Sequence, residues 1–252
     1  MGVNILRLAT AALLIAISAG AASGEDAKRP LAVVELFTSQ GCNSCPPADE
    51  NLSDLARSRD VVTLAYHVDY WDYLGWRDTL ASPDNTARQH EYNRALGNRS
   101  VYTPQAIVNG RKHVNGAKRY KLDRAIDEMA GTDKGLTIDV DASYEGRTLV
   151  IDAGASASWK GVAQVVLVYF NPATAVTIGR GENAGREFTY RHAVSGFHTV
   201  GMWHGKAARF EMPISEIAKK GAGGCAVLVQ EMLEGGLPGA ILGATILYKP
   251  SS

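Results

Sequence analysis

The 252-residue sequence predicts an α/β domain followed by an all-β, sandwich-like domain. The first observation is that strand-like apolar runs alternate with helical spacing over residues 31–131. The second is that one strand-like run follows another over residues 135–250, with few helical stretches between them. The third is an apolar fraction of 46%, which can supply a core and excludes a disordered chain.

The α/β part begins with a buried strand over residues 31–38. Apolar residues at helical spacing then indicate a helix, and they are Ala48, Leu52, Leu55 and Ala56. A second apolar strand covers residues 61–68. Because the two strands are joined through a helix, we expect them to be parallel with a right-handed crossover.

Cap and turn signals define the rest of this part. Ser82 followed by Pro83 is typical of a helix start, and Gly97 is typical of a helix end. Asn109-Gly110 joins two short strands as a hairpin. A last helix is expected over residues 122–129, which completes the order β-α-β-α-β-β-α.

The second part contains seven strand-like runs and one short helix near residues 214–220. The runs lie at about 136–142, 147–153, 162–170, 188–194, 206–212, 224–232 and 240–248. The loop "GRGENAGRE" between two of them is glycine-rich, but it does not open a helix after a strand. We therefore predict no phosphate-binding role for it.

The N-terminus predicts a secretory signal peptide over residues 1–23. Arg7 precedes an apolar run, and Ala19-Gly20-Ala21 is a small-residue cleavage site. The run from Leu8 to Ala22 is shorter than the roughly 20 apolar residues that a membrane span needs. We expect a periplasmic or secreted protein with no stable membrane anchor after signal cleavage; an uncleaved anchor is the alternative.

Acidic and basic residues balance at 26 each, so the chain has no electrostatic footprint for nucleic acid. The chain has three cysteines, too few for a disulfide framework. Cys225 lies in an apolar run and is expected to be a buried core residue. A thiol relay from Cys225 to the other two cysteines is the alternative.

The other two cysteines form a Cys-x-x-Cys motif, Cys42 and Cys45, directly after the first strand. One interpretation is a redox pair acting on exported protein thiols or disulfides without a cofactor. A second is a copper-binding chaperone, because soft thiolates select Cu(I) and His67 ends the neighbouring strand. A third is a structural disulfide in a non-catalytic interaction protein. His192, His198 and His204 recur every six residues, but glycines between them argue against a shared metal site.

Three segments carry a resemblance. "VELFTSQGCNSC" resembles the strand-to-helix turn of thioredoxin-like proteins, "YHVD" the end of their second strand, and "ALGNRSVYTPQAIVNG" the segment into their cis-proline. The whole chain is similar to a secreted bacterial thioredoxin-like family of unknown function, domain-of-unknown-function family twelve-twenty-three. "ELFTSQGCNSCPPAD", "HVDYWDYLGW", "SVYTPQ", "GENAGREFTYRHAV" and "AVLVQ" carry that similarity. The resemblance implies a thioredoxin-like domain and export, and it assigns no activity.

The resemblance also implies roles for residues around the cysteines. Glu35 becomes a buried proton carrier for Cys45, with an acid facing solvent or paired with an arginine as the alternative. Pro104 is expected to follow a cis peptide, which lets Thr103 present its backbone to an extended substrate.

Two further expectations concern the surroundings of the motif. Tyr70 and Trp71 begin an aromatic segment that is either the wall of a substrate groove or a plug between the two domains. Pro46 and Pro47 place the start of the regular helix near Ser44 or Cys45. Cys42 is expected to be the exposed, attacking thiol, with Cys45 resolving the mixed disulfide.

Overall fold

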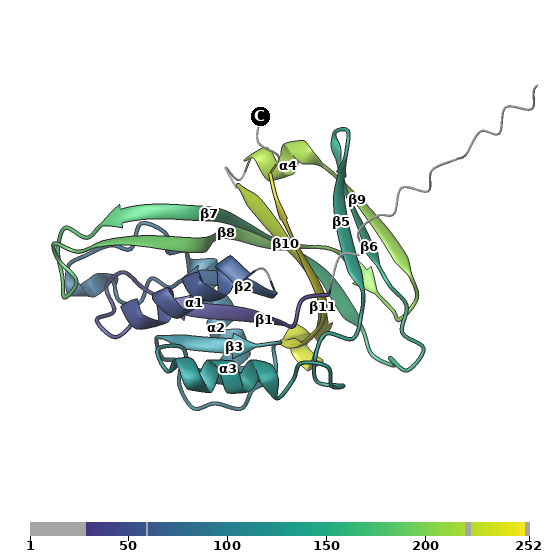
Figure 1. Cartoon of the computed structure of the whole chain (residues 1–252), viewed down its shortest axis with the longest axis horizontal. Coiled ribbons are helices and arrows are strands. Elements are labelled where there is room, and N and C mark those ends of the chain that lie inside the picture. The colour runs from purple at the N-terminus through teal and green to yellow at the C-terminus, as the bar shows by residue number, and fades with distance from the viewer. Residues whose placement is uncertain (1–28, 59, 220–222, 250–252) are drawn as a thin grey trace, which may run out of the picture.

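The computed structural model describes residues 29–58, 60–219 and 223–249 (Figure 1). The signal peptide predicted over residues 1–23 lies outside the described residues. The elements run in the order β1 (Ala32–Thr38), α1 (Pro46–Ser58), β2 (Val61–His67), η1 (Asp72–Leu74), α2 (Pro83–Ala95), β3 (Gln105–Val108), β4 (Lys112–Asn115), α3 (Arg119–Asp127), β5 (Val140–Glu145), β6 (Thr148–Ala153), β7 (Ala163–Thr177), β8 (Glu187–Trp203), β9 (Ala208–Pro213), α4 (Ile214–Lys219), β10 (Gly224–Met232), η2 (Glu234–Gly236) and β11 (Pro238–Tyr248).

The chain has a mixed α/β fold with one large, mostly β sheet. Eight strands form this sheet in the order β11-β10-β7-β8-β2-β1-β3-β4, and β5, β6 and β9 form a second, three-stranded sheet. Strands β1 and β2 are parallel, as the predicted crossover requires, and β3 and β4 continue the sheet antiparallel. The carboxyl ends of β1 and β2 therefore meet at one edge, with Thr38 opposite His67.

Apolar side chains cover both faces of the large sheet. On one face, Val34 and Leu36 of β1 pack with Leu52 of α1 and Leu122 of α3. On the other face, Val33 and Phe37 of β1 join a cluster with strands of the second half and Tyr92 of α2. Alternate residues of β1 thus point to opposite layers, which decides where Glu35 lies.

The second half of the chain also forms two packed layers. Val140, Leu149 and Ile151 of the small sheet pack against large-sheet residues such as Leu167 and Val227. Strands of the second half of the chain therefore contribute to both sheets. The large sheet, however, does not stop at the boundary expected between residues 131 and 135, because β8 pairs parallel with β2 at Ala65 and Ala193.

The long strands β7 and β8 explain this continuity. They have 15 and 17 residues, so they extend well beyond the runs predicted at 162–170 and 188–194. Strand β8 passes through Gly196 and Gly201, which the sequence suggested as interruptions, with shifts of register against β7. The two strands project as a ribbon over α1 (Figure 1).

Most local signals are confirmed. The Ser82 side chain accepts a hydrogen bond from Asn85 N at the start of α2, and Asn109 and Gly110 both have the positive φ of a tight hairpin turn. Helix α1 begins at Pro46, directly after the start expected near Ser44 or Cys45. Within the described residues, no helix is long and apolar enough to cross a membrane.

Candidate functional site

Cys42 and Cys45 form a disulfide between the end of β1 and the start of α1, with their Cα atoms 5.4 Å apart. The main-chain oxygen of Cys45 accepts hydrogen bonds from the N–H groups of Ala48 at 2.8 Å and Asp49 at 3.2 Å. Cys45 therefore occupies the N-cap position, and Cys42 lies in the loop before the helix.

Both cysteines are buried, with exposed fractions of 2% for Cys42 and 0% for Cys45. The expectation of an open Cys42 is therefore wrong for this conformation. The two residues between the cysteines, Asn43 and Ser44, are exposed, so the turn reaches the surface while its sulfur atoms face inward.

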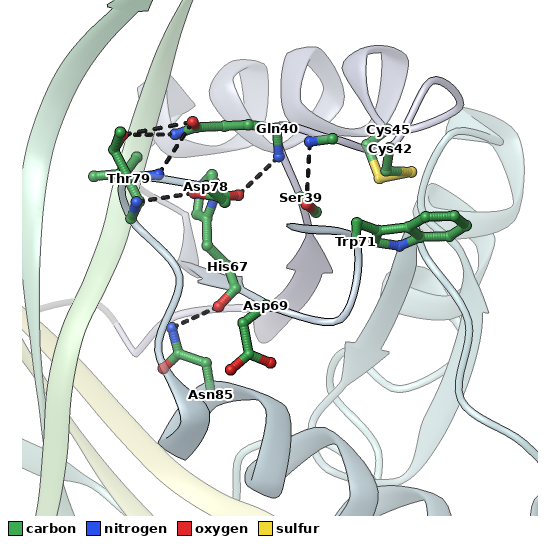
Figure 2. A network of polar contacts seen from close by, with 12 residues as sticks. Ser39, Gln40, Cys42, Cys45, His67, Asp69, Trp71, Asp78, Thr79 and Asn85 are labelled. Atoms are coloured by element: carbon green, nitrogen blue, oxygen red, sulfur yellow. Dashed lines mark hydrogen bonds and ion pairs between the residues drawn. A yellow bond between two sulfur atoms is a disulfide. The ribbon is translucent and has the colours of Figure 1, made fainter. Parts of the chain in front are cut away.

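Thr103 and Trp71 lie directly at the Cys42 sulfur. The Thr103 hydroxyl donates a hydrogen bond to Cys42 Sγ at 3.2 Å, and Trp71 Nε1 donates to Thr103 Oγ1 at 2.7 Å. The Thr103–Pro104 peptide is cis, as the resemblance implied. Figure 2 shows the Trp71 ring beside the disulfide. The structure thus brings together Cys42, Cys45, Thr103, Pro104 and Trp71.

The aromatic segment after β2 divides between the two expected roles. Tyr70 donates to Gln89 Oε1 at 3.1 Å, and Tyr73 is 77% exposed. Trp76 donates from Nε1 to Gln40 Oε1 at 2.8 Å and closely contacts Gly179 in the loop between β7 and β8. Trp76 is therefore a plug between the two halves, whereas Trp71 belongs to the disulfide site.

Glu35 is fully buried and pairs with Arg88, at 2.7 Å between Oε1 and Nη2. Tyr92 donates to the other carboxylate oxygen, and Gln230 of β10 donates to Tyr92 Oη at 2.7 Å. Burial lowers the pKa of Arg88, but the Glu35 carboxylate outweighs this and holds the pKa above its usual range. The expected alternative, an acid paired with an arginine, is what the structure contains.

The placement of Glu35 does not support its expected role as proton carrier for Cys45. Its side chain lies on the sheet face shared by Val33 and Phe37. Helix α1, which carries Cys45, packs on the opposite face with Val34 and Leu36. The sequence places an acid in β1 but does not show which face α1 covers.

His67 ends β2 and is fully buried beside Asp78, with 2.8 Å between His67 Nδ1 and Asp78 Oδ2. The same carboxylate oxygen accepts the Gln40 N–H at 2.8 Å (Figure 2). Burial works to lower the pKa of His67, but Asp78, with help from Asp49, raises it above its ordinary value. Burial works to raise the pKa of Asp78, and His67 with the N–H groups of Gln40 and Leu80 lowers it.

Asp49 is a titratable residue that the sequence interpretation missed. It follows Cys45 by one helical turn in α1, and burial raises its pKa to about 7, against the lowering effect of His67. Asp49 Oδ1 and His67 Nε2 are both buried without a hydrogen-bond partner in the described structure. Asp49 also lines a pocket of about 360 Å³ between α1 and the start of β8. An acidic residue among the inward-facing residues of α1 was the sequence feature that could have indicated this site.

Asn183 is a second residue missed by the sequence interpretation. It lies in the "GRGENAGRE" loop, is 1% exposed, and donates from Nδ2 to the main-chain oxygens of Gln40 at 3.0 Å and Cys42 at 3.1 Å. The loop was expected to have no phosphate role; its Asn183 contacts the cysteine loop. Nothing in its local pattern indicates this partner, 141 residues earlier in the chain.

No group of three or more His, Cys, Asp or Glu side chains that could hold a metal ion occurs in residues 29–58, 60–219 and 223–249. His67 is paired with Asp78 instead of joining Cys42 and Cys45. Among the repeated histidines, His192 is buried and bonded to Thr63, and His198 stacks on Tyr169.

Cys225 is fully buried in β10, and burial raises the pKa of its thiol to about 11. Strands β7, β8 and β2 separate it from β1. At about 4.8 Å per strand, this distance excludes direct exchange with Cys42 or Cys45 in this conformation. The expectation of a buried core residue is confirmed.

Comparisons with known proteins place the chain in a family. The family described as "Protein of unknown function (DUF1223)" matches residues 33–230. The X-ray crystal structure of an Agrobacterium tumefaciens protein, a target of the Northeast Structural Genomics Consortium, is 46% identical, covers 89% of this chain and 97% of its own, and has a TM-score of 0.81.

A structure described as HBP35 of Porphyromonas gingivalis has a TM-score of 0.55, covers 87% of this chain and 75% of its own, and is 13% identical. That likeness concerns the fold alone. No curated protein matches the chain. The family match spans most of the sequence and confirms the similarity to domain-of-unknown-function family twelve-twenty-three: the protein belongs to the DUF1223 family.

Proposed function

We propose that this protein is an exported thiol–disulfide oxidoreductase that acts on the thiols or disulfides of exported proteins through Cys42 and Cys45. The observation that carries the proposal is the disulfide at the N-cap of α1, with the Thr103 hydroxyl 3.2 Å from Cys42 Sγ. A hydroxyl donor at that sulfur stabilises the thiolate that exchange requires.

A thioredoxin-like unit over residues 31–131 is part of this proposal. The order β1-α1-β2-α2-β3-β4-α3 and the strand order β2-β1-β3-β4 support it. So does the position of the cysteines, because side chains at the carboxyl ends of parallel strands gather at one edge of a sheet. The β7–β8 ribbon then completes the site from the second half of the chain.

The proposed chemistry is a two-electron exchange. In the reduced protein the Cys42 thiolate attacks a substrate disulfide, which forms a Cys42–substrate S–S bond and releases one substrate thiolate. The Cys45 thiolate then attacks Cys42 Sγ, which forms the Cys42–Cys45 disulfide and releases the second substrate thiolate. The substrate is reduced by two electrons and the protein is oxidised; the reverse sequence oxidises a substrate dithiol.

Asp49 is the proposed acceptor of the Cys45 proton, in place of Glu35. It lies in the first turn of α1, and its main-chain N–H donates to the Cys45 main-chain oxygen at 3.2 Å. A carboxyl whose pKa is raised to about 7 can take up and release a proton near neutral pH. The pocket lined by Asp49 gives that proton a route to solvent.

A structural disulfide is the second candidate, and one observation favours it: both cysteines are buried. Under the proposed function, a substrate must displace Trp71, which is only partly buried beside the disulfide. A reduction potential below about −300 mV, together with no exchange in the folded state, would favour the structural candidate.

Trapping experiments test the proposal. Cys45→Ser is expected to accumulate a mixed disulfide through Cys42 with an exported protein or a model disulfide peptide, whereas Cys42→Ser traps none. Asp49→Asn is expected to slow resolution more than attack. Titration of the reduced protein with Cu(I) is the parallel measurement, and tight one-to-one binding that is lost in His67→Ala would replace this proposal with copper binding.

A further inference from the structure

The loop between β7 and β8 reaches back to the cysteine loop. It is closed on itself by main-chain hydrogen bonds, from Ile178 N to Arg186 O at 2.9 Å and from Gly185 N to Ile178 O at 2.8 Å. The Ile178 side chain is buried, which anchors the base of the loop. Asn183 is therefore held at the site by a loop whose main chain is itself restrained.

The orientation of the Asn183 amide is fixed from both ends. Arg186 Nη1 donates to Asn183 Oδ1 at 2.9 Å, so the amide oxygen faces the guanidinium and the NH2 group faces the cysteine loop. Arg186 is itself held over the Phe188 ring at 4.6 Å. The two amide hydrogens then satisfy the main-chain oxygens of Gln40 and Cys42.

These two hydrogen bonds restrain residues 40–42, the segment that positions Cys42 for disulfide formation with Cys45. The Gln40 main-chain N–H is already fixed by Asp78, and the Cys42 N–H by Ser39 O. Asn183 adds a restraint on the main-chain oxygens of the same two residues. Together these contacts hold Cys42 at a set distance from Cys45, whose main chain is fixed by the first turn of α1.

We propose that Asn183 is a positioning residue that shifts the redox equilibrium of Cys42 and Cys45 toward the disulfide. In the oxidised protein the covalent ring restrains Cys42 whether or not Asn183 is present. In the reduced protein the ring is open, and the Asn183 bonds keep the Cys42 main chain close to Cys45. The Asn183 bonds therefore form at a smaller entropic cost in the disulfide form than in the dithiol form, so their loss destabilises the disulfide more and favours the dithiol. The inference rests on the proposed function only in requiring that the disulfide exchanges in the folded protein.

The test is redox titration of the full mature protein against glutathione. In the measured reaction two glutathione thiols reduce the Cys42–Cys45 bond, which yields two cysteine thiols and one glutathione disulfide. Asn183→Ala is expected to lower the equilibrium constant for forming the protein disulfide by about fivefold to tenfold, since its two hydrogen bonds contribute more free energy to the disulfide form than to the dithiol form. A tenfold change corresponds to a potential about 30 mV less negative.

Matched variants separate positioning from general loosening of the fold. Glu182→Gln, an exposed neighbour, is expected to leave the equilibrium constant unchanged. Asn183→Gln, which keeps the amide, is expected to recover part of the wild-type value. Arg186→Met, which leaves Asn183 in place but frees its amide to rotate, is expected to shift the equilibrium in the same direction by less than Asn183→Ala. Arg186→Met also serves as the test if Asn183→Ala does not fold.

The outcomes distinguish the two proposals. Equal equilibrium constants for wild type, Asn183→Ala and Arg186→Met would overturn the role of Asn183 and leave the proposed function standing. A wild-type disulfide that does not exchange with glutathione in the folded state would overturn both. Unfolding measurements on the oxidised and reduced forms check that Asn183→Ala lowers the stability of the disulfide form more than that of the dithiol form.

Discussion

His67 Nδ1 lies 2.8 Å from Asp78 Oδ2, and both side chains have an exposed fraction of 0%. The pair ties the end of β2 to the loop before α2, and through the Gln40 N–H it also supports the cysteine loop. A buried pair of this kind contributes little over an apolar replacement, but removing one partner leaves an uncompensated group.

Asp78→Asn is therefore expected to lower the free energy of unfolding by about 3–5 kcal/mol near pH 6. The folded pKa of His67 is raised, so its contribution is fully present below about pH 6.5 and is lost as pH rises through the folded pKa. The folded pKa of Asp78 is lowered, so its contribution is present above its unfolded pKa of about 3.8 and is lost as pH falls through the lower, folded pKa.

Urea unfolding between about pH 5 and pH 9 measures both the loss of stability and its pH dependence. The wild type should lose stability above pH 6.5 more steeply than Asp78→Asn. Asp133→Asn, at an exposed position, is the control and should follow the wild type. Parallel pH profiles for wild type and Asp78→Asn would contradict the role of the pair.

Asp49→Asn is expected to stabilise the protein by about 1–3 kcal/mol near pH 8, because it removes a buried carboxylate that must ionise there. Burial raises the pKa of Asp49 to about 7. The contribution of Asp49 to the free energy of unfolding is therefore present below its unfolded pKa of about 4 and is lost as pH rises through 7. The Asp49→Asn variant should not show this loss of stability. Unfolding free energies near pH 4 and pH 8 provide the measurement. A variant less stable than wild type at both values would argue against this assignment.

Glu35→Gln is expected to cost about 3–5 kcal/mol, because it leaves Arg88 buried without its carboxylate. The double variant Glu35→Leu/Arg88→Met should recover much of this loss, since it removes both charges. Glu128→Gln breaks only exposed ion pairs and should leave the free energy of unfolding close to that of the wild type. If Glu35→Gln lowers the free energy of unfolding no more than Glu128→Gln does, the buried network around Glu35 does not contribute the expected stability.

Cys225 is expected to resist alkylation in the folded protein and to react after unfolding, because burial raises the pKa of its thiol to about 11. Cys225→Ala should leave the glutathione equilibrium of Cys42 and Cys45 unchanged and cost about 1 kcal/mol of stability. Mass spectrometry of the alkylated protein, with and without denaturant, provides the readout. A shifted glutathione equilibrium of Cys42 and Cys45 in Cys225→Ala would instead support a thiol relay from Cys225.

The sequence predicted features whose causes are local. Ser82 and Pro83 start a helix because the hydroxyl accepts an N–H and the proline lacks one, whatever the rest of the fold does. Asn109-Gly110 makes a tight turn because both residues tolerate positive φ. The family resemblance added the cis Thr103–Pro104 peptide, which lies beside the disulfide.

Features that depend on distant partners could not be predicted in this way. The alternation in β1 shows that Glu35 faces away from Val34 and Leu36, but only the packed structure shows which of these layers contains α1. Asn183 contacts a loop more than a hundred residues earlier, which no local pattern encodes. The pairing of β8 with β2 is equally non-local, since its register depends on the whole sheet.

Because β8 pairs with β2, the first half of the chain is not expected to be stable when it is separated from the second half. Strand β2 is buried along its whole length, and β8 covers part of its outer side. A fragment ending near residue 131 would present β2 as an apolar edge with unpaired N–H and C=O groups, which is a template for aggregation. Expression of the first half alone is thus expected to give insoluble protein, and insertions between the two halves are best placed in the surface loop around Thr132 to Lys134, where the backbone is exposed.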